Sequence, residues 1–260
     1  ALGANVNTYT PSRFKEGYGL SKEAIKKLAK AGTKFLVTVD CGISNNREIA
    51  LAKELGLKTL ILDHHIPTEL PDADCIVNPA QEGCPFKDYK LAAAGLVWML
   101  LIVLRKKLRE QEIEGPDPKD FLDLASLGTI CDMVPLKEVN RLIAHRGVDA
   151  LAQTKRPGLV ALKEASNISS NKRISAGHIS FHLGPRINAS GRLDHAEKAL
   201  EMLSTSDSIK AKKIAKSLSS LNSQRRAIEE RVKKACIGEL GDEVQKQSAF
   251  AVYGKDFHLG

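Results

Sequence analysis

Short apolar segments alternate with amphipathic helical patterns in the first third of the chain, and this alternation limits the fold more than any other feature. Three segments, at Phe35–Val39, 59–62 and Cys75–Val77, are typical of strands, and helices are predicted over 22–31 and 44–55. A helix between consecutive strands is the usual connection of a parallel sheet. We therefore predict an α/β fold with a parallel sheet flanked by helices. The almost continuous apolar run of the first strand also predicts burial on both faces.

The remainder of the chain has a helical pattern. The apolar stretch 91–104 is too short to span a bilayer and is followed at once by three basic residues, so we expect a buried helix there and no membrane partner. Helices are predicted over residues 92–110, 118–128, 141–153, 157–165 and 175–182.

A long, highly charged helix is predicted over 208–240, where apolar residues recur at steps of three, four and seven. So narrow an apolar stripe indicates packing along one side only, as in a helix that connects two domains. Residues 249–253 are predicted to begin a strand. The expected domains are therefore 1–205, the connecting helix 206–242, and the start of another domain at 243–260.

Composition restricts the partners and the compartment. The formal net charge of +8 favours polyanionic partners without establishing them. The five cysteines are scattered and form no CxxC pair, which argues against a zinc ribbon and predicts reduced core thiols in a cytoplasmic protein. No signal peptide is visible at the N-terminus.

Chemically reactive side chains follow the ends of apolar segments. Asp40 follows the first strand, Asp63-His64-His65 follow the second, and Asp132 follows a helical run. Because the carboxyl ends of parallel strands face one crevice, the first two groups should lie close together. Carboxylates with imidazoles suit Mn²⁺ and can serve Mg²⁺. Asp40 could alternatively be only a turn or helix cap. Neighbouring histidines on an extended segment point opposite ways, so one could bind metal while the other faces substrate.

Five motifs together resemble the DHH phosphoesterase family, and most closely its RecJ group of bacterial single-strand DNA exonucleases. The resemblance covers essentially the whole chain in order. It is carried by residues 9–20 (YTPSRFKEGYGL), 39–42 (VDCG), 63–67 (DHHIP), 127–136 (LGTICDMVPL) and 184–193 (GPRINASGRL).

The resemblance implies roles for these residues. Asp40 would bridge two divalent cations, Mn²⁺ or Mg²⁺, and His64 and Asp132 would complete the shell of the second. His65 would contact the scissile phosphate, and Asp63 would orient the histidines. Such a pair of cations clamps the attacking water and the leaving oxygen of an in-line displacement.

The resemblance also implies phosphate contacts in two basic segments. Arg13 would grip a 5′ phosphate, and Arg186, Asn188 and Arg192 would bind nucleic acid in a segment whose glycines permit close approach to a ligand. From the residues alone, this segment could be no more than a basic surface loop.

The family's first motif, Asp-x-Asp-Ala-Asp-Gly, would precede Tyr9, and residues 257–260 resemble the opening of the family's DHHA1 domain. We therefore expect this chain to carry half of a metal site, to lack the first strand of the sheet, and to turn over little by itself.

Three functions are compatible with these motifs. The first is the core of a 5′-to-3′ single-stranded DNA exonuclease in repair and recombination, with a single-strand binding protein or a helicase as possible partners. The second is a DHH enzyme acting on short oligonucleotides or small phosphates. The third is a non-catalytic scaffold in a replication or repair complex.

Overall fold

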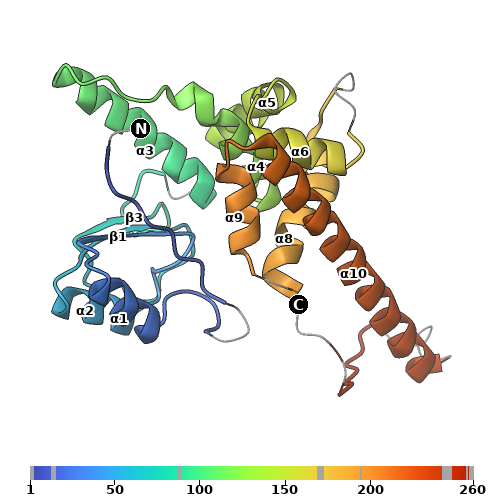
Figure 1. Ribbon diagram of the computed structural model, residues 1–260. Helices are drawn as coiled ribbons and strands as arrows, with labels where there is room; N and C mark the ends of the chain where they lie inside the picture. Colours follow the sequence, from blue (N-terminus) through green and yellow to red (C-terminus); the bar gives the residue numbers. More distant parts are fainter. Residues whose placement is uncertain are drawn as a thin grey trace.

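The computed structural model describes residues 3–12, 16–86, 90–168, 173–193, 195–241, 248–255 and 257. Its sheet has three parallel strands in the order β1 (Phe35–Val39), β2 (Lys58–Leu62) and β3 (Cys75–Val77) (Figure 1). Val39 pairs with Leu62, and Leu62 pairs with Val77, so the carboxyl ends of all three strands are level. The predicted parallel α/β fold is confirmed.

Two helices cover one face of this sheet. Helix α1 (Lys22–Lys30) begins at Ser21, whose side chain accepts a hydrogen bond from the amide of Ala24, and α2 (Asn46–Glu54) connects β1 to β2. A small apolar core between the helices and the strands contains Ile25, Leu36, Ala52 and Leu57.

The other face of β1 is open, so the prediction of burial on both faces is wrong. Phe35, Val37 and Val39 are 57%, 42% and 46% exposed. β1 lies at the edge of the sheet, and α3 (Ala93–Glu110) contacts β1 and β2 without covering these three side chains. A continuous apolar run predicts the strand correctly, but it does not show that a second layer of structure covers the other face of that strand.

The helical part packs beside the sheet, and the long α10 runs along its outer side (Figure 1). Its core is apolar and includes Leu127, Leu162, Ile179 and Leu218. Beyond α3, its elements are η2 (Pro118–Phe121), α4 (Leu122–Cys131), α5 (Glu138–Ala152), α6 (Pro157–Ala165), α7 (Ala176–His178), η3 (Ile179–Leu183), α8 (Gly184–Leu193), α9 (Glu197–Ser204) and α10 (Ser208–Leu240).

From α3 onward, the structure departs from the sequence-based expectations at four places. Residues 93–104 of the apolar stretch lie in α3 as expected, but Ile102 and Val103 are 42% and 55% exposed, so only the first part of this helix is buried. The segment 184–193 is helix α8 and not a surface loop, and the sequence pattern predicts no helix where α9 lies. Residues 249–253 form no strand, because no described segment pairs with them.

The cysteines are free thiols, and none is fully buried, although Cys131 packs against the helical core. Cys75 is exposed, and the other four are partly exposed. Among the described helices, none combines the length and the apolar character needed to cross a membrane.

Candidate metal centre and adjoining cavity

Three chain segments bring acidic and imidazole groups to the carboxyl edge of the sheet. Asp40 follows β1, Asp63-His64-His65 follow β2, and Asp132 is the C-cap of α4. The Oδ1 atom of Asp40 lies 3.0 Å from Nε2 of His64, and Oδ2 of Asp132 lies 3.5 Å from the same nitrogen. One imidazole nitrogen therefore faces two carboxylates from different parts of the fold.

Asp63 is the buried support of this arrangement. Its side chain is 1% exposed, and Oδ2 accepts a hydrogen bond from the amide of Ile43 at 3.1 Å. Its Oδ1 accepts bonds from the amides of His64 at 2.8 Å and His65 at 3.2 Å, and lies 2.6 Å from Nδ1 of His65. Asp63 thus fixes both the backbone of the triplet and the ring of His65, leaving Nε2 of His65 on the side away from Asp63.

The charges at this edge influence one another. The hydrogen bond to Asp40 raises the pKa of His64. Burial raises the pKa of Asp132, an effect that His64 partly offsets. For Asp63, burial acts to raise the pKa, but hydrogen bonds from His65 and from the amide of Ile43 outweigh it, so its pKa is lowered. Negative charge therefore gathers around one imidazole, as a cation would require.

The donor set fits a hard divalent cation. Ligand atoms of Asp40, His64 and His65 all lie within 4.8 Å of one another. Burial raises the pKa of Cys41 and of Cys131 to about 11, and among the described residues neither thiol belongs to this group of ligand atoms. Carboxylate and imidazole without thiolate suit Mn²⁺ or Mg²⁺ better than a structural zinc.

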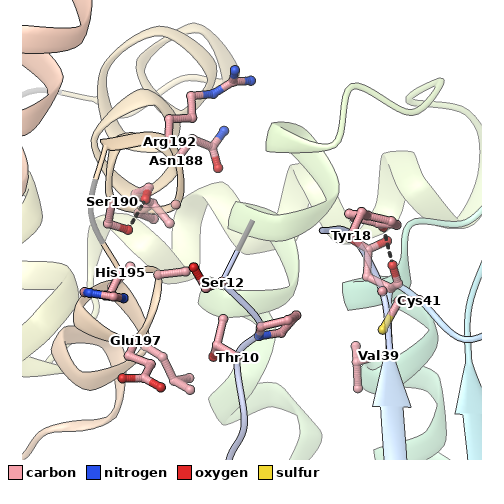
Figure 2. Close-up of a pocket in the computed structure, with 18 of the residues that line it drawn as sticks. Thr10, Ser12, Tyr18, Val39, Cys41, Asn188, Ser190, Arg192, His195 and Glu197 are labelled. Atoms are coloured by element: carbon pink, nitrogen blue, oxygen red, sulfur yellow. Dashed lines mark hydrogen bonds between the residues drawn. The ribbon is translucent and has the colours of Figure 1, made fainter. Parts of the chain in front are cut away.

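A cavity of about 480 Å³ adjoins this centre. It is lined by residues 10–12 and 17–19, by the end of β1 with Asp40, and by residues of α8 and α9 (Figure 2). Such a volume is within the usual range for small-molecule and cofactor sites.

Helix α8 separates the predicted phosphate-binding residues. Asn188 and Arg192, four positions apart, both line the cavity. Arg186 does not line it. Its Nη1 donates to the carbonyl oxygen of His182 at 2.7 Å, and its Nε donates to Oγ of Ser219 on α10 at 3.1 Å.

The glycine that begins α8 serves packing rather than ligand approach. A Cβ on Gly184 would lie 2.5 Å from Sγ of Cys131, the residue before Asp132. Arg13 lies outside the described residues. Tyr18 lines the cavity, and its hydroxyl donates a hydrogen bond to the carbonyl oxygen of Asp40; the sequence predicts no such role, although the two flanking glycines signal an unusual backbone.

Comparison with known proteins identifies the family. Residues 1–129 match the family described as "DHH family, N-terminal domain". A curated relative, the single-stranded-DNA-specific exonuclease RecJ of Salmonella typhimurium, is 36% identical over 274 residues, which cover all of this chain and 47% of the relative. The chain thus spans about half the length of this relative.

Solved structures support the same conclusion. A crystal structure of exonuclease RecJ bound to manganese is 34% identical, with a TM-score of 0.82 over 93% of this chain and 60% of that one. RecJ from Thermus thermophilus in complex with Mn²⁺ is 32% identical, with a TM-score of 0.75 over 86% of this chain and 33% of that one. The chain belongs to the DHH family and is similar, over nearly its whole length, to RecJ exonucleases.

Proposed function

We propose that the chain is the metal-binding core of a 5′-to-3′ single-stranded DNA exonuclease. The observation that carries this proposal is the meeting of Asp40, His64 and Asp132 at one imidazole nitrogen. The similarity to single-stranded-DNA-specific RecJ enzymes, two of which were crystallised with manganese, supports the substrate and the cation.

In this proposal, Asp40, His64 and Asp132 hold Mn²⁺ or Mg²⁺. Two bound cations would activate water and stabilise the leaving oxygen of an in-line displacement at phosphorus. Asp40 would be shared between the two cations. Because Nε2 of His64 faces both carboxylates, His64 is the expected nitrogen ligand.

His65 is assigned to the scissile phosphate. Its Nδ1 lies 2.6 Å from Asp63, so Nδ1 carries the proton of that hydrogen bond and Nε2 is left for another partner. A bond from Nε2 to a phosphate oxygen requires a second proton on the ring. Since His65 also lies within ligand distance of Asp40 and His64, direct binding of a cation is its alternative role.

The adjoining cavity is proposed to receive the terminal nucleotide. Asn188 and Arg192 line the same cavity as Asp40, and a guanidinium can pair with a phosphate through two donors. Arg13 would contribute to the same grip. The net charge of +8 agrees with a polyanionic substrate.

The wider assignments are proposals of the same kind. Residues 1–205 would form the DHH unit, 206–242 the connecting helix, and 243–260 the start of a DHHA1 domain. The cellular role would be DNA repair and recombination in the cytoplasm, with a single-strand binding protein or a helicase as partner.

The test is release of nucleotides from 5′-phosphorylated single-stranded DNA, with the chain in its full-length context. Release should depend on Mn²⁺ or Mg²⁺ and continue along DNA of many tens of nucleotides. D40N should lower the rate at least ~100-fold, because a shared ligand contributes several kcal/mol. D149N, at an exposed aspartate of α5, is the matched control and should leave the rate unchanged.

Two results would contradict the proposal. Cleavage confined to oligonucleotides of a few residues would favour the second family activity, a phosphodiesterase of short oligonucleotides. Absence of both hydrolysis and Mn²⁺ binding would favour a non-catalytic scaffold.

A further inference from the structure

The loop before α1 places a tyrosine against the metal centre. The hydroxyl of Tyr18 donates a hydrogen bond of 2.5 Å to the backbone carbonyl oxygen of Asp40, which Figure 2 draws as a dashed line. The Tyr18 ring also lies edge-on to the ring of His65, with centroids 6.1 Å apart and planes at 74°. Tyr18 therefore touches the backbone of one expected ligand and the side chain of the neighbouring histidine.

The backbone of Asp40 needs this kind of support. Its φ of +63° lies in the left-handed region, which residues with a side chain seldom adopt. The amide of Asp40 donates to the carbonyl oxygen of Leu62 at 2.9 Å, and the carbonyl of Asp40 accepts from Tyr18. These two bonds hold the amide and the carbonyl of a strained residue whose carboxylate must stay beside His64.

The loop that carries Tyr18 has its own anchor on α2. Gly17 and Gly19 flank Tyr18 with φ values of +81° and +88°, and a Cβ on Gly19 would lie 2.8 Å from Oδ1 of Asn45. The side chain of Asn45 accepts from the amide of Leu20 and donates to its carbonyl oxygen, each at 3.4 Å. The position of Tyr18 is therefore fixed independently of Asp40.

A second anchor lies on the other side of Tyr18. The carboxylate of Glu16 accepts hydrogen bonds from the hydroxyl of Tyr9 at 2.5 Å, the amide of Ser12 at 2.8 Å and the hydroxyl of Ser21 at 3.1 Å. The bond to Glu16 raises the pKa of Tyr9 to about 12. With both flanks held, the loop can act as a rigid support for the metal centre.

We propose that Tyr18 is a positioning residue of the metal centre: its hydroxyl fixes the Asp40 peptide so that the Asp40 carboxylate stays beside His64. The inference rests on the proposed function only in taking Asp40 as a cation ligand. A tyrosine that merely filled space would be replaceable by phenylalanine, whereas a positioning hydroxyl is not.

The decisive variant is Y18F, which removes one oxygen from a side chain that is 62% exposed. Mn²⁺ affinity, followed by the electron paramagnetic resonance signal of free Mn²⁺, should fall ~5-fold, the equivalent of one lost hydrogen bond. In the full-length protein, kcat at limiting Mn²⁺ should fall by a similar factor while KM for single-stranded DNA stays constant. Y253F, at a tyrosine that is 83% exposed, is the matched control, and D40N reports complete loss of the site.

A second readout does not depend on metal. The amide hydrogen of Asp40 should exchange with solvent ~5-fold faster in metal-free Y18F than in the wild type or in Y253F. Unchanged Mn²⁺ affinity together with unchanged exchange in Y18F would overturn the inference.

A third variant tests the ring separately. Should Y18L raise KM for DNA while Y18F binds Mn²⁺ as the wild type does, Tyr18 contacts substrate and its positioning role is refuted. Should the wild-type chain bind no Mn²⁺, the metal centre itself is refuted, and the exchange rates still decide whether Tyr18 holds Asp40.

Discussion

The Oδ1 atom of Asp40 lies 3.0 Å from Nε2 of His64, although the two residues are 24 positions apart in the chain. The parallel register of β1 and β2 produces this contact, because Val39 pairs with Leu62 and each strand ends one residue before its acidic group. The register of the sheet therefore determines which carboxylate lies beside His64, and the protonation of His64 should be measurable.

The Asp40–His64 pair predicts a pH dependence of the metal-free protein. The hydrogen bond to Asp40 raises the pKa of His64 above 6.5, so the folded state binds this proton more tightly than the unfolded state does. The resulting stability is fully present below pH 6.5 and is lost as the pH rises through the raised pKa. Urea unfolding in a chelator should detect this loss, and it should be smaller in D40N, because asparagine tolerates the left-handed backbone.

Binding of Mn²⁺ should respond to pH in the opposite direction. A proton on Nε2 of His64 competes with the cation, so Mn²⁺ affinity should rise as the pH increases through the raised pKa of His64. Nuclear magnetic resonance titration of the His64 ring gives that pKa directly. A value at or below 6.5 without metal would contradict both expectations.

Replacing Asp63 by asparagine should destabilise the fold as well as the site. The buried carboxylate accepts hydrogen bonds from the backbone N–H groups of Ile43, His64 and His65. In an asparagine, the side-chain NH2 group would face one of these N–H donors and could not accept its hydrogen bond. We expect D63N to lower the free energy of unfolding by about 2–4 kcal/mol at pH 7. D149N is the control and should change it by less than about 0.5 kcal/mol.

The dependence of stability on pH in acid gives a further check on the role of Asp63. Its folded pKa is lowered, so its contribution to stability is present above pH 3.8 and is lost as the pH falls through the lowered value. The difference between wild type and D63N should therefore shrink in acid. A difference that persisted unchanged at the lowest pH would assign the loss to packing instead.

The sheet edge could be predicted from the sequence because it depends on local patterns. The apolar runs predicted β1 and β2. Because parallel strands have their carboxyl ends at the same edge of the sheet, Asp40 was expected to lie near Asp63-His64-His65. The distance of Asp132 from His64 could not be predicted in this way, because it depends on how α4 packs against α3, the helix that contacts β1 and β2. The same limit explains β1, whose apolar run says nothing of what covers Phe35 and Val37.

Helix α8 shows a second kind of limit. Its sequence contains glycines at 184 and 191 and a proline at 185, which together resemble a loop, yet proline is tolerated in the first turn of a helix. As a helix, the segment places Arg186 and Arg192 on different faces, and only a three-dimensional structure separates their roles. The family motif alone treats them alike.

Substituting alanine for Gly184 should disturb the support of Asp132. The new Cβ would lie 2.5 Å from Sγ of Cys131 and 3.3 Å from the carbonyl oxygen of Ile179, so α8 and α4 would have to move apart. We expect the free energy of unfolding to fall by about 1–3 kcal/mol, with weaker Mn²⁺ binding. Thermal and urea unfolding measure the first effect, and Mn²⁺ titration measures the second.

Two further variants separate the effect of the steric clash at residue 184 from the general effect of replacing a helical glycine by alanine. On α10, a Cβ at Gly238 would meet nothing within 4 Å, so G238A should be neutral or stabilise by up to about 1 kcal/mol. Adding C131A to G184A should recover part of the lost stability, because it removes the sulfur that the new methyl group meets. No recovery in the double variant would show that the clash involves the backbone.

The two arginines of α8 should respond differently to truncation. Arg192 lines the cavity, so R192A should weaken single-stranded DNA binding and reduce the slope of log K against log salt by about 0.7, with unchanged thermal stability. Arg186 bonds His182 and Ser219, so R186A should lower the free energy of unfolding by about 1–2 kcal/mol. S219A, which removes the α10 partner without removing a charge, should lose part of that stability and leave the salt slope unchanged. Should R186A keep full stability and reduce the salt slope more than R192A does, Arg186 would be the principal phosphate contact and the separation of roles along α8 would be wrong.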